Sequence, residues 1–292
     1  MRLSTKIIIG IILSIFLLSL LHIISFSFTD RKHYQKIFLD RSIKIPQMDK
    51  TGINIESYRV ITVASKRSDN EGGFYIYFTN EENGLFIQPA ASTDEENSLF
   101  IPKALYDCIS TKSNNDTLTL TINLDEVRDK YGTIDEANAK SNHSLSSSIP
   151  VSGFNLYLHT SNINVINQLN GVQTLISNIV AESIKISSKG DVTIDSCKAN
   201  VIEPYSKRKL NVSNSFAKVL ILDLDEINNW KIDNCDIEAR NYTGGRPNHS
   251  ITITGDESEK INWLPKNKEA ELNLKFKGSA AKINFDTQSI SE

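Results

Sequence analysis

Aspartate and glutamate side chains are the residues of this sequence with the greatest potential for chemistry. Asp223, Asp225 and Glu226 form one cluster, and Asp195 and Asp233 share one place in a repeated pattern. A glycoside hydrolase needs two carboxyl groups about 5–10 Å apart across a sugar ring. Asp195 and Asp233 could meet that distance, but each stands beside Ser or Asn, where turn-forming residues belong. We therefore expect turns at this pair, a solvated edge at the cluster, and no catalytic residues.

The histidines and cysteines lack the spacings of metal or redox sites. The sequence has five His and three Cys, and none falls in a His-x-x-x-His or Cys-x-x-Cys arrangement. Gly244-Gly245 is too short for a phosphate-binding loop, and no helical pattern follows it. The sequence therefore predicts no metal and no cofactor. Cys197 and Cys235 are expected to be small, reduced and buried.

One polar loop has the composition of a contact site. Residues 241–249, Asn-Tyr-Thr-Gly-Gly-Arg-Pro-Asn-His, are rich in turn formers and are predicted to project from the last regular repeat. Tyr242, Arg246 and His249 give this loop an aromatic ring, a guanidinium group and an imidazole. These three residues are the candidate contacts with a partner, and the alternative is a long turn that binds nothing.

A repeat must position these residues. Five segments carry apolar residues at the first, third, eighth and tenth places, with Thr at the third place of the second segment, and Ser or Cys at the sixth, and their starts lie 16, 20, 18 and 20 residues apart. The spacing of two indicates strands with one buried face, and the step of three between the third and sixth places indicates a corner. The segments are residues 156–165, 172–181, 192–201, 210–219 and 230–239.

A short unit at a near-constant period buries its apolar face only by stacking on its neighbours. The predicted fold is therefore all-β: a single-stranded, right-handed parallel β-helix (a solenoid) with an N-terminal transmembrane helix. The third places should form one interior ladder, which consists of Leu158, Thr174, Ile194, Val212 and Ile232. The sequence shows no helical stretches of the length that an α/β fold needs. An antiparallel sandwich remains the alternative.

The N-terminus carries a long apolar run. Residues 7–28 have no charged side chain and follow Arg2 and Lys6. As a helix this run would be about 33 Å long, enough to cross a bilayer. A cleaved signal peptide is the alternative, but no small-x-small cleavage site follows the run. We predict a single-pass membrane protein with most of its chain on the periplasmic side of a bacterial inner membrane, although Arg31, Lys32 and Lys36 leave the orientation open.

Four regions follow from these patterns. β-prone runs return after residue 54 and are broken by Asn- and Ser-rich turns. The regions are a membrane anchor at 1–29, a stalk at 30–53, an opening β-rich segment at 54–150, and the regular repeats with a C-terminal cap at 151–292. The last two of these regions could form one continuous domain over residues 54–292.

Two stretches carry a family resemblance. Residues 100–109, Phe-Ile-Pro-Lys-Ala-Leu-Tyr-Asp-Cys-Ile, and residues 117–122, Thr-Leu-Thr-Leu-Thr-Ile, resemble the opening of bacterial head GIN-domain proteins, the auto-transporter adhesin-like proteins of the cell envelope. The resemblance covers roughly residues 55–280, and the family's Asn-Gly turn is replaced here by Asn114-Asn115-Asp116. The resemblance implies a parallel β-helix fold. Because no active site is associated with such a family, the resemblance assigns no catalytic residues to this chain.

Charge and composition exclude some classes of function. The 32 basic and 35 acidic residues give a net charge of −3 without strong blocks, so no nucleic-acid partner is predicted. We expect a non-enzymatic, membrane-anchored cell-envelope protein that acts as a scaffold or adhesin-like binding surface, with an envelope protein or a glycan as its partner. On the solvent-facing side of the predicted strands, one row consists of the polar residues Asn164, Asn200, Lys218 and Glu238. The alternative is a polysaccharide-binding or polysaccharide-cleaving protein.

Overall fold

The structure is a computed structural model, and it places most of the chain after residue 42. The contacts divide the chain into one unit of Met1–Ser42 with Gly132–Leu145 and a second unit of Ile43–Tyr131 with Ser146–Glu292. The described residues are 17–19, 43–47, 49–66, 74–78, 83–92, 95–131, 147–160, 163–167, 172–227, 229–254, 259–277 and 283–287.

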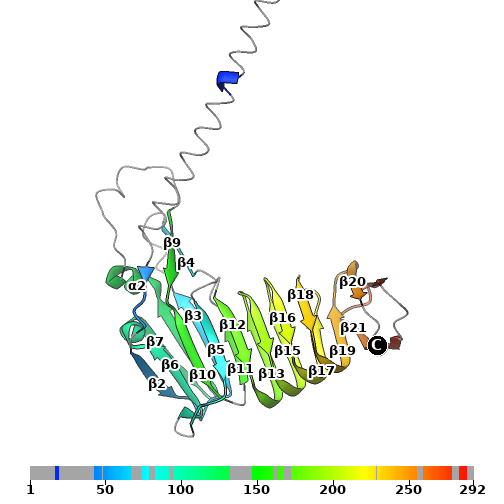
Figure 1. Ribbon diagram of the computed structural model, residues 1–292, viewed down its shortest axis with the longest axis horizontal. Helices are drawn as coiled ribbons and strands as arrows, with labels where there is room; N and C mark the ends of the chain where they lie inside the picture. The colour runs from blue at the N-terminus through cyan, green and yellow to red at the C-terminus, as the bar shows by residue number, and fades with distance from the viewer. Residues whose placement is uncertain are drawn as a thin grey trace, which may run out of the picture. The chain divides into compact units, whose positions relative to one another are not determined.

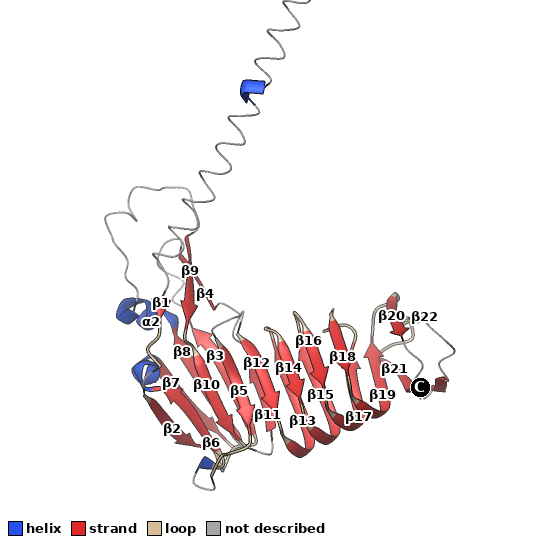
Figure 2. Cartoon of the chain, in the orientation of Figure 1, coloured by secondary structure: helices blue, strands red, loops and turns tan. Residues whose placement is uncertain are grey.

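All described strands belong to the second unit and form four sheets (Figures 1 and 2). Two short helical elements, η2 (Lys103–Cys108) and α2 (Leu124–Tyr131), lie between strands of the first half. The strands are β1 (Ile43–Lys44), β2 (Lys50–Asn54), β3 (Val60–Lys66), β4 (Phe74–Phe78), β5 (Gly84–Gln88), β6 (Ser98–Pro102), β7 (Ile109–Asn114), β8 (Thr117–Asn123), β9 (Ser147–Ser152), β10 (Asn155–His159), β11 (Ile163–Asn167), β12 (Gln173–Ser177), β13 (Val180–Ser188), β14 (Val192–Asp195), β15 (Lys198–Ser206), β16 (Leu210–Ser213), β17 (Phe216–Asp223), β18 (Trp230–Asp233), β19 (Asp236–Gly244), β20 (His249–Thr254), β21 (Glu259–Pro265), β22 (Leu272–Lys277) and β23 (Ile283–Thr287).

From β12 to β19 the chain alternates between two large sheets. The even-numbered strands β12 to β18 enter an eight-stranded sheet, the odd-numbered strands β13 to β19 enter a ten-stranded sheet, and every pairing among them is parallel. Side chains alternate between the buried and outer sides of these strands, as the spacing of two predicted. Ile176, Ile194, Val212 and Ile232 stand in register in one row.

Four of the five predicted ladder residues stand in one row, and Thr174 does not; Ile232, at the end of the row, is only half-buried. Thr174 pairs with Val192 rather than with Ile194. Leu158 joins the row through Ile87 of β5, which pairs with both Leu158 and Ile176. Thr174 is nonetheless buried, at 1% exposure, so the error lies in the register along the strand and not in the buried face.

A left-handed residue makes each corner between the two sheets. Asn178, Ser196, Asn214 and Asn234 have φ angles of 57°, 54°, 50° and 51°, a region that Asn tolerates better than most residues. The N–H of Asn178 donates to the carbonyl of Asp195 at 3.1 Å, and the same bond recurs one repeat later from Ser196 to Ser213. The polar residues that the sequence suggested as corners therefore do form turns.

The prediction of one parallel β-helix is wrong for the chain as a whole. Among the described strands, β6 pairs antiparallel with both β10 and β2, and β7 pairs antiparallel with β8. Two further small sheets, β1-β9-β4 and β20-β22, stand apart from the large ones. The repeat pattern covers residues 156–239 alone, and β5 separates β10 from β12 within the eight-stranded sheet. The tight turn at Asn115 joins β7 to β8 directly, which allows an antiparallel pair.

The predicted transmembrane helix and single-pass membrane location also require correction. Residues 7–28 lie outside the described part of the chain except for a helical turn at residues 17–19. Within the described residues, no helix has the length and apolar character needed to cross a membrane.

Candidate functional site

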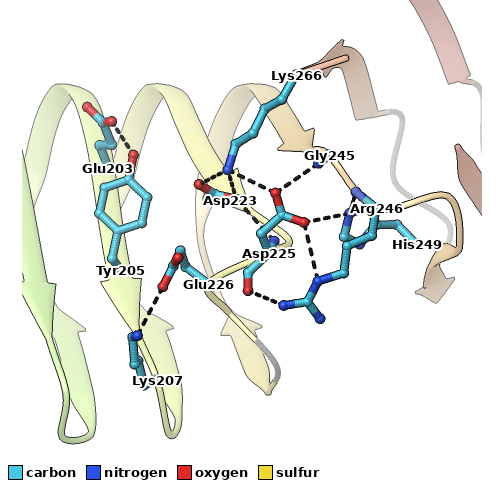
Figure 3. Close-up of polar contacts among 10 residues, drawn as sticks. All are labelled: Glu203, Tyr205, Lys207, Asp223, Asp225, Glu226, Gly245, Arg246, His249 and Lys266. Atoms are coloured by element: carbon cyan, nitrogen blue, oxygen red, sulfur yellow. Dashed lines mark hydrogen bonds and ion pairs between the residues drawn. The ribbon is translucent and has the colours of Figure 1, made fainter. Parts of the chain in front are cut away.

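The loops that follow β13, β15, β17, β19 and β21 gather at one edge of the ten-stranded sheet. These strands run parallel, so their carboxyl ends meet at the same edge. The register aligns Ser188 with Ser206, and Asp223 with Thr243. Figure 3 shows the polar side chains that this edge brings together.

Asp225 is the centre of a charged cluster. Its Oδ2 accepts hydrogen bonds from the N–H of Gly245 at 2.8 Å and from Nζ of Lys266 at 3.0 Å. Its Oδ1 lies 3.1 Å from Nε2 of His249 and 3.6 Å from Nε of Arg246 (Figure 3). The Asp225 carbonyl accepts a further bond from Nη2 of Arg246 at 2.9 Å. One carboxylate therefore joins three loops.

Asp223 and Lys266 form the buried part of this cluster. Nζ of Lys266 donates to both carboxylate oxygens of Asp223, at 2.8 and 2.6 Å. The Asp223 side chain is only 8% exposed, so it depends on this cation for compensation. The N–H of Asp225 donates to Asp223 Oδ1 at 3.0 Å, which closes a turn at the end of β17.

The cluster keeps its acid and base charged. Burial acts to raise the pKa of Asp225, but the hydrogen bonds from Lys266 and Gly245 and the charges of Lys266 and His249 outweigh it, so this pKa lies below the ordinary value. Burial likewise acts to lower the pKa of Lys266, and the two aspartates outweigh it, so that pKa is raised. Neither group is poised to exchange a proton near neutral pH.

The predicted contact loop is only partly available for contact. Tyr242 is 2% exposed and points into the core, so it cannot meet a partner at the surface. His249 is 7% exposed, and its ring lies edge-on to Trp263 at 6.1 Å. A Cβ on Gly244 would come within 2.4 Å of the His249 ring, which explains the glycine there. Arg246 is exposed but is tied to Asp225.

A groove lies beside the cluster, at the ends of β13 and β15. It is an open hollow of about 460 Å³. Lys189 and Lys207 are exposed on its rim, and Tyr205 and Glu226 are half-buried in its wall. Its lining consists of Ser187, Ser188, Lys189, Tyr205, Ser206, Lys207 and Glu226.

The Tyr205 ring is held in place by a small polar network. Its hydroxyl donates to Oε1 of Glu203 at 2.5 Å, and Glu203 also pairs with Nζ of Lys185 at 2.7 Å (Figure 3 shows the first contact). Burial, then the bond to Glu203, raises the pKa of Tyr205, so its hydroxyl stays protonated. Burial acts to raise the pKa of Glu203, but the bonds from Lys185 and Tyr205 outweigh it and hold that pKa below the ordinary value.

The other acids that the sequence singled out are corner residues. Asp195 accepts hydrogen bonds from Ser213 at 2.6 Å, Asn214 at 2.8 Å and Ser196 at 3.0 Å, and these bonds lower its pKa. Asp233 pairs with Lys231 at 2.9 Å, and both side chains are largely exposed. The pair Asp195 and Asp233 therefore has the turn role that the sequence favoured.

All three cysteines lie in the described part of the chain. Cys108, Cys197 and Cys235 are free thiols. Cys197 is buried, as predicted, whereas Cys235 is only half-buried. Within the described ranges, no group of three or more His, Cys, Asp or Glu side chains is placed to hold a metal ion.

Sequence reasoning missed the groove. Tyr205, Lys189 and Lys207 stand between repeated segments, where the pattern of apolar residues gives no information. A signal was present in the recurrence of Ser188-Lys189 as Ser206-Lys207, 18 residues later. Of the predicted outer row, Lys218 and Glu238 are exposed and Asn200 is half-buried, while the Asn164 side chain lies outside what the structure describes.

No protein-family model matches the sequence, and no curated protein matches it. Among solved structures, the chain is similar to a "putative adhesin" of Bacteroides fragilis, with 14% identity over 85% of this chain and 100% of that one, at a TM-score of 0.42. A "putative lipid binding protein" of Parabacteroides distasonis shares 9% identity over 82% of this chain and 96% of that one, at a TM-score of 0.34.

The likeness to these structures is distant. The description of the first agrees coarsely with the adhesin-like resemblance in the sequence, and neither description identifies a GIN domain.

Proposed function

We propose that this chain is a non-enzymatic, adhesin-like binding protein that contacts a glycan at the groove beside Tyr205. The observation that carries the proposal is the groove itself. It combines a fixed aromatic ring, two exposed ammonium groups and one carboxylate within a hollow of about 460 Å³. Binding sites for small ligands and sugars combine a concave apolar surface with a few polar groups in this way.

The engagement of the nearby acids supports binding rather than cleavage. A glycoside hydrolase needs one carboxyl group that can give up a proton and a second that is free to act as base or nucleophile. Asp223 and Asp225 are both bound by Lys266, and the pKa of Asp225 is lowered. Among the described residues, the Glu226 side chain pairs with Lys207 at 3.6 Å, and the lining of the groove includes no second carboxylate beside it.

The resemblance of residues 100–122 to GIN-domain proteins supports the same assignment, because that family is adhesin-like and brings no active site. A purely structural scaffold would need no groove. The half-exposed Tyr205 ring therefore favours the binding role over the scaffold role.

Glycan-array binding by the purified full chain tests the proposal. We expect binding to at least one glycan class, loss of that binding in Tyr205→Ala, and no release of reducing ends. Phe216→Ala is the matched control, because Phe216 is another half-buried aromatic on the same sheet and does not line the groove. Glycan binding that survives Tyr205→Ala, or glycan turnover abolished by Asp225→Ala, would refute the proposal.

A further inference from the structure

We infer that the groove takes an acidic polysaccharide, a chain of uronic acids, whose carboxylates meet Lys189 and Lys207 while one sugar face lies on the Tyr205 ring. This inference rests on the proposed function and adds the chemical class of the ligand.

The charge of the groove favours an anion. Lys189 and Lys207 line it with a single acid, Glu226. The contact between Lys207 and Glu226 is 3.6 Å long, and both side chains are about half exposed or more, so it holds Lys207 weakly. Lys209 lies in the same loop and is also exposed, which adds positive potential there.

The neighbouring aspartates do not cancel this potential. Asp223 and Asp225 stand beside the groove, and one cation, Lys266, donates hydrogen bonds to both carboxylates. Arg246 and His249 add further positive or polar contacts to Asp225. With Lys266 and Arg246 opposite two aspartates, the cluster has balanced charge, and Lys189 and Lys207 set the sign of the groove.

The parallel register places the two lysines at the ends of neighbouring strands. Ser188 and Ser206 are paired on neighbouring strands, so the lysines that follow them leave β13 and β15 side by side. Neighbouring strands lie about 4.8 Å apart, so anionic groups of one ligand could meet both ammonium groups. A linear polymer with a carboxylate on successive sugars would supply such anions along the direction in which the strands stack.

The Tyr205 ring adds preference for a sugar over a simple polyanion. Its hydroxyl is fixed by Glu203, which is in turn fixed by Lys185, so the ring is oriented before a ligand arrives. Aromatic side chains offer a large apolar contact at a low cost in conformational entropy. A polyanion without sugar rings would gain nothing from this contact.

Calorimetric titration of the full chain with an oligogalacturonide and with its methyl ester tests the inference. The two probes share every sugar atom and differ in charge. We expect the free acid to bind about tenfold more tightly, since two partly exposed ion pairs contribute modestly. This advantage should shrink as salt is added. It should vanish in the double variant Lys189→Gln/Lys207→Gln and persist in Lys218→Gln, whose lysine is exposed elsewhere on the sheet.

Three outcomes would overturn the inference. Equal or tighter binding of the methyl ester would show that charge plays no part. Equal binding of polyglutamate, or free-acid binding that survives Tyr205→Ala, would show that no sugar face is recognised. Failure of this inference can be told apart from failure of the proposed function. If only neutral glycans bind, and bind through Tyr205, the proposed glycan-binding function stands and the acidic-ligand inference fails. If no glycan of any kind binds, both the function and the inference fail.

Discussion

Lys266 holds Asp223 across 43 residues of sequence, with Nζ at 2.8 and 2.6 Å from the two carboxylate oxygens. The contact ties the loop after β21 to the end of β17, two strands away in the ten-stranded sheet. Asp223 is almost fully buried, and Lys266 is 40% exposed. The lysine therefore compensates the charge of a carboxylate that water reaches poorly, next to the turn in which the N–H of Glu226 donates to the Asp223 carbonyl.

Removing this lysine should destabilise the protein. Lys266→Met leaves the Asp223 carboxylate buried and unpaired, which should lower the free energy of unfolding by about 1–3 kcal/mol. Urea denaturation followed by circular dichroism measures the loss. Asp223→Asn in the same background should restore part of it. Lys231→Met is the control, because its partner Asp233 is exposed and its loss should cost under about 1 kcal/mol. Equal losses at Lys231 and Lys266 would contradict this account.

Low pH should lower the free energy of unfolding because Asp225 becomes protonated. The pKa of Asp225 is lower in the folded state than in the unfolded chain, so its contribution to stability is complete above the unfolded value, about pH 4. That contribution should be lost as the pH falls through the folded pKa. Unfolding free energies at several pH values between about 6 and 2 should therefore fall more steeply in the wild-type chain than in Asp225→Asn. Parallel curves for the two proteins would disprove the assignment.

The left-handed corner at Asn178 should accept glycine and reject valine. Its φ of 57° lies in a region that costs a β-branched residue about 1–2 kcal/mol. Asn178→Val should lose about that much stability, and Asn178→Gly should stay within about 0.5 kcal/mol of wild type. Thr193→Val, on a neighbouring strand, shows whether valine as such is tolerated. Thermal or chemical unfolding compares the three, and an Asn178→Val protein as stable as wild type would rule out the corner's role.

The same corners explain how far the sequence could predict the fold. Ile194, Val212 and Ile232 were placed in one row correctly, because their segments have the same length between strand and corner. The 172–181 segment was aligned on Ser177, whereas its corner residue is Asn178, equivalent to Ser196. That choice displaced Thr174 by two positions. Alignment on the residue that takes the left-handed conformation would have found the correct register.

The first half of the fold depends on pairings that a repeat cannot reveal. β5 inserts between β10 and β12, and β6 pairs antiparallel with β10 across a long stretch of sequence. Such neighbours are set by side-chain packing over distant segments, and a local pattern is silent about them. The groove was missed for a related reason, since Tyr205 and Lys207 acquire meaning only when parallel strands bring Lys189 and Glu226 beside them.

The three cysteines should differ in reactivity. Burial raises the pKa of the Cys197 and Cys108 thiols, so both should resist alkylation in the folded protein. Cys235 is half-buried and should be alkylated first. Iodoacetamide labelling of the native chain, read by mass spectrometry, measures the order, and labelling in urea should modify all three. Native labelling of Cys197 ahead of Cys235 would be inconsistent with the structure.

Hydrogen–deuterium exchange of the full chain, with and without a saturating oligogalacturonide, tests the central claim most directly. Ligand should slow amide exchange in the loops that border the groove, at residues 187–190, 205–209 and 224–227. The outer row around Lys218 and Glu238 should exchange as before. The proposal predicts protection confined to these three loops and absent in Tyr205→Ala. Protection centred on the outer row, or none at saturation, would contradict it.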